Sequence, residues 1–103
     1  MAFRTLATRG LALLGLLLSL AGAAQAQSPG NTPATAIALP GIQHETDGVS
    51  AEYVYIREHF PGWKPGMQAL ISAGGRHYDR IELTGPDGAT QAIFFDITDW
   101  FGK

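Results

Sequence analysis

The hydrophobic pattern of the second half of the chain begins with a helical period. Apolar side chains recur four, three and four residues apart, at Val49, Tyr53, Ile56 and Phe60. This spacing lines them along one helical face. We expect the helix to begin at Ser50 as its N-cap, with Glu52 in the first turn opposing the helix dipole, and to end at Pro61-Gly62. A strand is the alternative, because Tyr53–Ile56 has high β propensity.

After residue 62 the period changes to that of strands. We predict strands over Met67–Ser72, His77–Thr84 and Thr90–Ile97, joined by a tight turn at Gly74-Gly75 and a second turn at Gly85–Gly88. In the third strand alternate apolar residues share one face, which we expect to be buried. The sequence therefore predicts an α+β domain over residues 49–103, in which one helix packs on a three-stranded antiparallel meander. The tail with Trp100 and Phe101 is expected to fold back onto it.

The first 26 residues have the features of a signal peptide. Arg4 and Arg9 precede the apolar run Leu11–Leu20, and Ala24-Gln-Ala26 provides the small residues that signal peptidase requires. A membrane anchor is the alternative, but the run is shorter than the roughly 20 residues needed to span a bilayer. We expect cleavage after Ala26, no membrane anchor afterwards, and a periplasmic or secreted protein.

Residues 27–48 are rich in Ser, Pro, Gly, Asn, Thr and Ala, so we predict a flexible leader. Ala36–Leu39 is the exception and is a candidate for a short edge strand. Without the first 26 residues the chain has five basic and nine acidic residues, a net charge of −4, and no cysteine. This charge argues against nucleic acid as a partner, and disulfides cannot stabilise so small a core. A partner chain is one way to bury more area.

The order of these elements resembles the PepSY domain. The shared features are a helix ending in Pro61-Gly62, the strand Arg76–Leu83, the turn at Asp87-Gly88 and the closing strand Ile93–Asp99. The chain departs from the family at its end, where Asp99 stands in place of the usual glycine. The resemblance implies a small extracytoplasmic regulatory or binding module. PepSY domains occur in protease propeptides, so it also implies peptidase inhibition as a role.

Candidate chemistry is sparse. His77 and Asp79 point to the same side of a strand and could orient a base or bind a metal, but two ligands make a poor site. We expect this pair at the wet end of the strand, outside the core. His44–Asp47 offers an imidazole and two carboxylates within the leader, where ordering them would cost entropy. We predict no catalytic, cofactor or metal site, and no enzyme.

The nine aromatic residues that follow the predicted signal peptide are more than one sheet face and one helix can bury. Phe94 and Tyr78 point to the face away from the helix, and Trp63 and Trp100 are expected near its rim. Tyr and Trp are common anchors of protein interfaces. The predicted function is therefore a binding or regulatory module that contacts another protein through this patch and through pairing at an exposed sheet edge. The alternatives are a small-molecule or metal-binding envelope protein that uses His77 and Asp79, and a self-associating structural protein.

Overall fold

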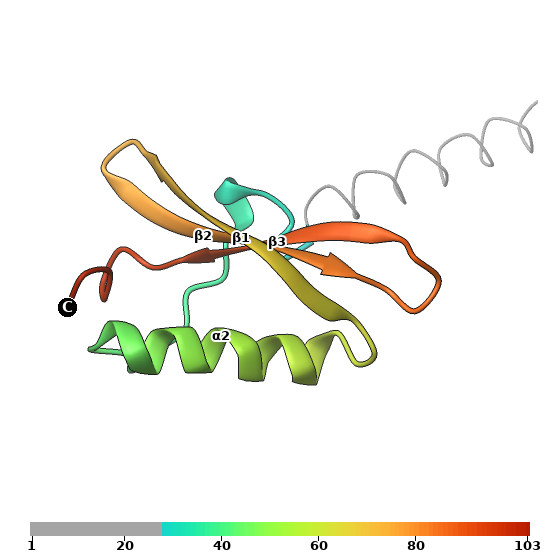
Figure 1. Cartoon of the computed structure of the whole chain (residues 1–103). Helices are drawn as coiled ribbons and strands as arrows, with labels where there is room; N and C mark the ends of the chain where they lie inside the picture. The colour runs from blue at the N-terminus through green and yellow to red at the C-terminus, as the bar shows by residue number, and fades with distance from the viewer. Residues whose placement is uncertain (1–27) are drawn as a thin grey trace, which may run out of the picture.

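The structure is a computed structural model that describes residues 28–103, so the predicted signal peptide lies outside the described residues. These residues form an open three-stranded antiparallel sheet with a helix across one face (Figure 1). Strands β1 (Lys64–Ala73), β2 (Arg76–Thr84) and β3 (Thr90–Asp96) lie in the order β1-β2-β3. The predicted α+β fold, one helix on a meander sheet, is confirmed. No helix within residues 28–103 is long and apolar enough to cross a membrane.

The helix α2 (Glu45–His59) begins five residues before the predicted Ser50 cap, so that prediction was wrong. The N-cap is His44, which makes no side-chain capping bond. Instead the N–H of Glu45 donates to the carbonyl of Lys103 at 3.0 Å. The tail of the chain thus pairs one of the N–H groups that a helix start leaves unpaired, an interaction that has no local sequence signature.

The core lies between α2 and the sheet. Its buried apolar side chains come from the helix, from two strands and from the tail. They are Ile56 of α2, Ile81 and Leu83 of β2, Ile93 and Phe95 of β3, and Ile97 and Trp100 of the tail. The predicted alternation along β3 is confirmed, and β2 alternates in the same way. Trp100 packs flat against α2 at Gly48, where a Cβ atom would stand 2.5 Å from its ring.

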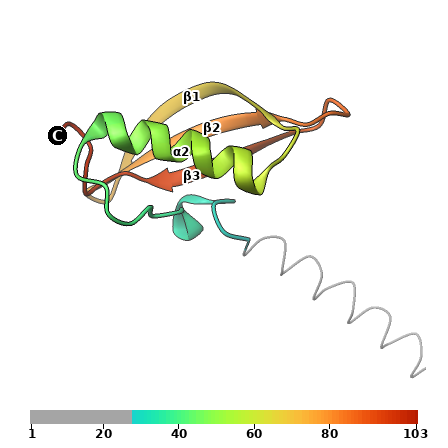
Figure 2. The same cartoon turned by 90° about the horizontal axis from the view of Figure 1, so that it is seen from below.

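The segment before α2 is closely associated with β3. The N–H of Ile37 donates to Phe94 O at 2.9 Å, Ile37 O accepts from Asp96 N at 2.8 Å, and Gly30 O accepts from Phe94 N at 2.8 Å. A short 3-10 helix, η1 (Pro33–Thr35), lies beside the same edge (Figure 2). The prediction of a flexible leader over 27–48 was wrong for this part. Ala36–Leu39 contributes a single bridge to β3, at Ile37, in place of the proposed edge strand.

Candidate functional site

The outer edge of β1 has no pairing partner among residues 28–103. β1 pairs with β2 only, whereas the outer edge of β3 is covered by the segment that contains Ile37. Figure 2 shows this asymmetry, with β1 at the far side of the sheet from η1. A free edge displays unpaired N–H and C=O groups that can pair with another extended chain. The sheet can therefore grow on one side.

The turn between β1 and β2 determines which backbone groups are free. Gly74 and Gly75 both have positive φ, +59° and +76°, and Ala73 is paired directly with Arg76, as in a two-residue hairpin of type I′. In such a hairpin, hydrogen-bonded and non-hydrogen-bonded pairs alternate from the turn outward. Ala73 and every second residue before it therefore bond to β2. The N–H and C=O groups that point outward belong to Gln68, Leu70 and Ser72.

The exposed edge also carries apolar side chains. Leu70 is 52% exposed and Met67 is 73% exposed, since the buried core takes side chains from β2 and β3 and none from β1. α2 reaches β1 where the hydroxyl of Tyr53 donates to Gln68 Oε1 at 3.3 Å. Lys64 and Pro65 protect the beginning of the strand, because charge and proline both discourage edge pairing. A bulge between Pro65 and Gln68 separates this protected end from the rest. From residue 68 to residue 73 the edge carries neither charge nor proline.

The four predicted contact residues do not form one patch. Tyr78 and Phe94 do lie on the face away from α2, both half-buried. Trp100 is 3% exposed and belongs to the core, and Trp63 packs beside Gly85 against that core. The prediction was wrong for Trp100, because the tail folds toward the helix side, whereas Trp63 is only half-buried and its role in a contact stays a prediction.

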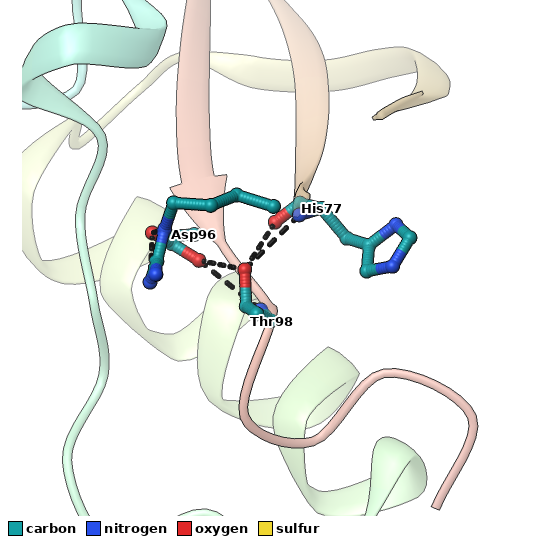
Figure 3. Close-up of polar contacts among 4 residues, drawn as sticks. His77, Asp96 and Thr98 are labelled. Carbon is teal, nitrogen blue, oxygen red and sulfur yellow. Dashed lines mark hydrogen bonds and ion pairs between the residues drawn. The ribbon is translucent and has the colours of Figure 1, made fainter. Parts of the chain in front are cut away.

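The open face around Tyr78 and Phe94 is charged. Arg76 pairs with Asp96 at 2.8 Å and Arg80 lies 3.9 Å from Glu82. At one end of this face Asp96 also accepts from the side chain and N–H of Thr98, whose hydroxyl in turn accepts from the N–H of His77 (Figure 3). Although burial raises the pKa of Asp96, the bonds from Thr98 and Arg76 outweigh it and hold the pKa below its usual range. These internal pairs leave this face less suited to an apolar contact than β1.

Two carboxyl groups are buried between α2 and the sheet. Glu52 is fully buried in the middle of α2, and Asp79, on β2, is 6% exposed. The sequence-based expectations placed Glu52 at the exposed start of the helix and Asp79 outside the core, and both were wrong. Gly48, Glu52 and Ile56 are four residues apart and therefore share the face of α2 that packs on the sheet.

Burial, together with the neighbouring Asp79, raises the pKa of Glu52 to about 9. Neither side-chain oxygen of Glu52 has a hydrogen-bond donor among the described residues. A proton on Glu52 makes one of these oxygens a donor toward Asp79 and removes the charge that burial disfavours. At neutral pH this pair therefore holds a proton inside the domain.

The remaining candidates for ligand binding are small. No group of three or more His, Cys, Asp or Glu residues that could hold a metal ion occurs within residues 28–103. His77 is bonded through Nδ1 to Ser72 Oγ at 2.8 Å and stacks on Phe101. A cavity of about 200 Å³ lies between residues 28–31 and β3. It is below the roughly 300–1,000 Å³ of sites for drug-sized ligands.

Comparison of the chain with family models, curated proteins and solved structures finds no match. The resemblance to the PepSY domain therefore stays a prediction.

Proposed function

We propose that this protein is an exported binding module that holds an extended polypeptide strand along the outer edge of β1. The observation that carries the proposal is the unprotected edge from Gln68 to Ala73. Its outward backbone groups have no strand partner within residues 28–103, and the side chain of Leu70 is exposed. Strand addition derives its affinity from backbone hydrogen bonds and its specificity from alternate side chains. A strand-binding edge also suits the peptidase-inhibitor role that the PepSY resemblance implies.

The proposal differs from a contact through Tyr78 and Phe94. Backbone pairing needs a free edge, whereas the Tyr78 and Phe94 face is crossed by the ion pairs of Arg76 and Arg80. A partner on that face would have to displace or desolvate these charges, which costs free energy. The β1 edge has no charge to desolvate after Lys64.

Selection of a random peptide library on the immobilised protein tests this function. We expect the selected peptides to slow amide hydrogen exchange at Gln68, Leu70 and Ser72. Leu70→Pro should abolish binding without breaking the β1–β2 ladder, because the N–H of residue 70 points outward. Phe94→Asp is the control and should bind as the unchanged protein does. Peptides that bind Leu70→Pro equally well, or that protect no amide of β1, would refute the proposal.

A further inference from the structure

We infer that β1 of a second copy of this chain occupies this edge, in antiparallel pairing about a two-fold axis at Leu70. The inference rests on the proposed function, since it names the strand that the β1 edge receives. It would join two three-stranded sheets into one sheet of six strands, with both α2 helices on the same face.

The outward N–H and C=O groups of β1 favour this register over the registers shifted to either side. With the axis at Leu70, the outward residues pair as Leu70 with Leu70 and Gln68 with Ser72 of the second copy, so all three find partners. Moving the axis to Ala69 would place Ser72 opposite Gly66 in the bulge, and moving it to Ile71 would place Gln68 opposite Gly74 in the turn. Either move shifts the register by two residues and leaves only two of the three outward residues of each strand with a pairing partner.

The side chains are also complementary in this register. On the helix side Leu70 meets its own copy, flanked by Gln68 opposite Ser72. Gln68 Oε1 accepts from Tyr53 and Ser72 Oγ is bonded to His77, so the bond left to this pair runs from Gln68 Nε2 to Ser72 Oγ. On the other side Ala69 lies opposite Ile71, a small residue beside a large one. No charged residue opposes a like charge, because Lys64 lies outside the paired segment and separated from it by the bulge.

The covered edge of β3 makes the assembly finite. A two-fold contact uses the same surface of both chains and leaves nothing further to pair on that side. The other edge of each sheet is already bonded to its own Gly30 and Ile37. One free edge per chain therefore gives a dimer and not a fibre.

Cysteine cross-linking tests the inference, because the chain contains no cysteine of its own. The full chain is expressed with one cysteine at a time, as Leu70→Cys, Gln68→Cys or Ser72→Cys. Each protein is purified in the form that the cells produce and is treated with a short bis-maleimide. We expect Leu70→Cys to cross-link with itself. Gln68→Cys and Ser72→Cys should cross-link only when mixed, since each alone lies about four residues, roughly 14 Å, from its own copy.

Light scattering across a concentration series gives the second readout. The average mass of the unchanged protein should rise with concentration from that of one chain to that of two. The mass of Leu70→Lys should stay at that of one chain, since edge charges oppose strand pairing. Val54→Lys is the matched control, because Val54 is also exposed but lies on the far side of α2 from the sheet, and it should dimerise as before.

A single-chain mass at all concentrations, or cross-linking of Gln68→Cys with itself, overturns the inference. The function proposed above fails separately, when selected peptides do not protect Gln68, Leu70 and Ser72. A monomer whose β1 amides are protected by peptides would therefore keep the function and remove only the second copy as its partner.

Discussion

The ionisation of Glu52 makes the stability of the fold depend on pH. Below its ordinary pKa of 4.5 it is protonated in both the folded and the unfolded chain. Between pH 4.5 and its folded-state pKa of about 9, only the folded chain keeps the proton. The unfolded state then binds fewer protons, so the free energy of unfolding falls by about 1.4 kcal/mol per pH unit. Above this range the loss is complete and the contribution levels off.

Glu52→Gln is expected to remove this pH dependence. The amide stays neutral and can still donate to Asp79, so we expect the free energy of unfolding to rise by about 2–4 kcal/mol near pH 7.5 and to change little near pH 4. Urea denaturation of both proteins across this pH range measures the difference. Glu58→Gln, at an exposed position of the same helix, is the control and should match the unchanged protein. Parallel pH profiles for Glu52→Gln and the unchanged protein would contradict the assigned proton.

Gly48→Ala tests the contact between α2 and Trp100. Alanine favours a helix by about 1 kcal/mol over glycine, but its Cβ would stand 2.5 Å from the ring of Trp100. We expect the clash to prevail, with a net loss of about 1–3 kcal/mol and a change in tryptophan fluorescence as the indole moves. Ser50→Ala is the control at an exposed position nearby. A more stable Gly48→Ala would mean that the ring does not lie against this glycine.

At the scale of elements, pattern analysis succeeded where the deciding contacts are local. Strands β2 and β3 alternate within themselves, and the turns at Gly74-Gly75 and Gly85–Gly88 have their own signatures, so these elements were predicted closely. The helix start and the burial of Glu52 were missed together. The helix start depends on the bond from Glu45 to Lys103, which is far away in sequence. The burial of Glu52 depends on which side of α2 packs against the sheet, and a glutamate on a helix face is ordinarily expected to be solvated.

The segment beside β3 acts as a fourth, minimal strand. Ile37→Pro removes the N–H that donates to Phe94, along with part of the packing of the Ile37 side chain against the core. We expect a loss of about 2 kcal/mol, together with faster amide exchange at Phe94 and Asp96, whose N–H groups bond to this segment. Ala38→Pro, at the exposed next position, controls for proline itself. Unchanged exchange at Phe94 in Ile37→Pro would show that the segment does not close this edge.

At the scale of the whole molecule, the sequence predicted the type of candidate site but not its place in the fold. An exposed sheet edge was expected from the sequence, but its location was not. Deciding between the edges of β1 and β3 requires knowing that residues 30–37, which have little hydrophobic pattern, pair with β3. The same limit explains why Trp100 was assigned to the surface, since its burial depends on Gly48 in another segment.

Removing the cover from β3 should change the assembly. A chain without residues 28–38 exposes both sheet edges, so the two-fold contact at β1 no longer ends the sheet. We expect its mass by light scattering to pass beyond two chains as concentration rises. The same deletion with Leu70→Lys should stop at two chains, since only β3 remains free. A deleted chain that stays at two copies would show that β3 is protected by its own side chains.

The bonds from Ile37 to Phe94 and from Glu45 to Lys103 join residues about 60 positions apart. During synthesis these two bonds can therefore form only after residues 94–103 have been added. The bond at the helix start needs Lys103, and the cover of β3 needs Phe94. Such non-local contacts slow folding. The cover of β3 and the first turn of α2 can therefore be completed only late in folding, when the residues at both ends of the described segment are present together.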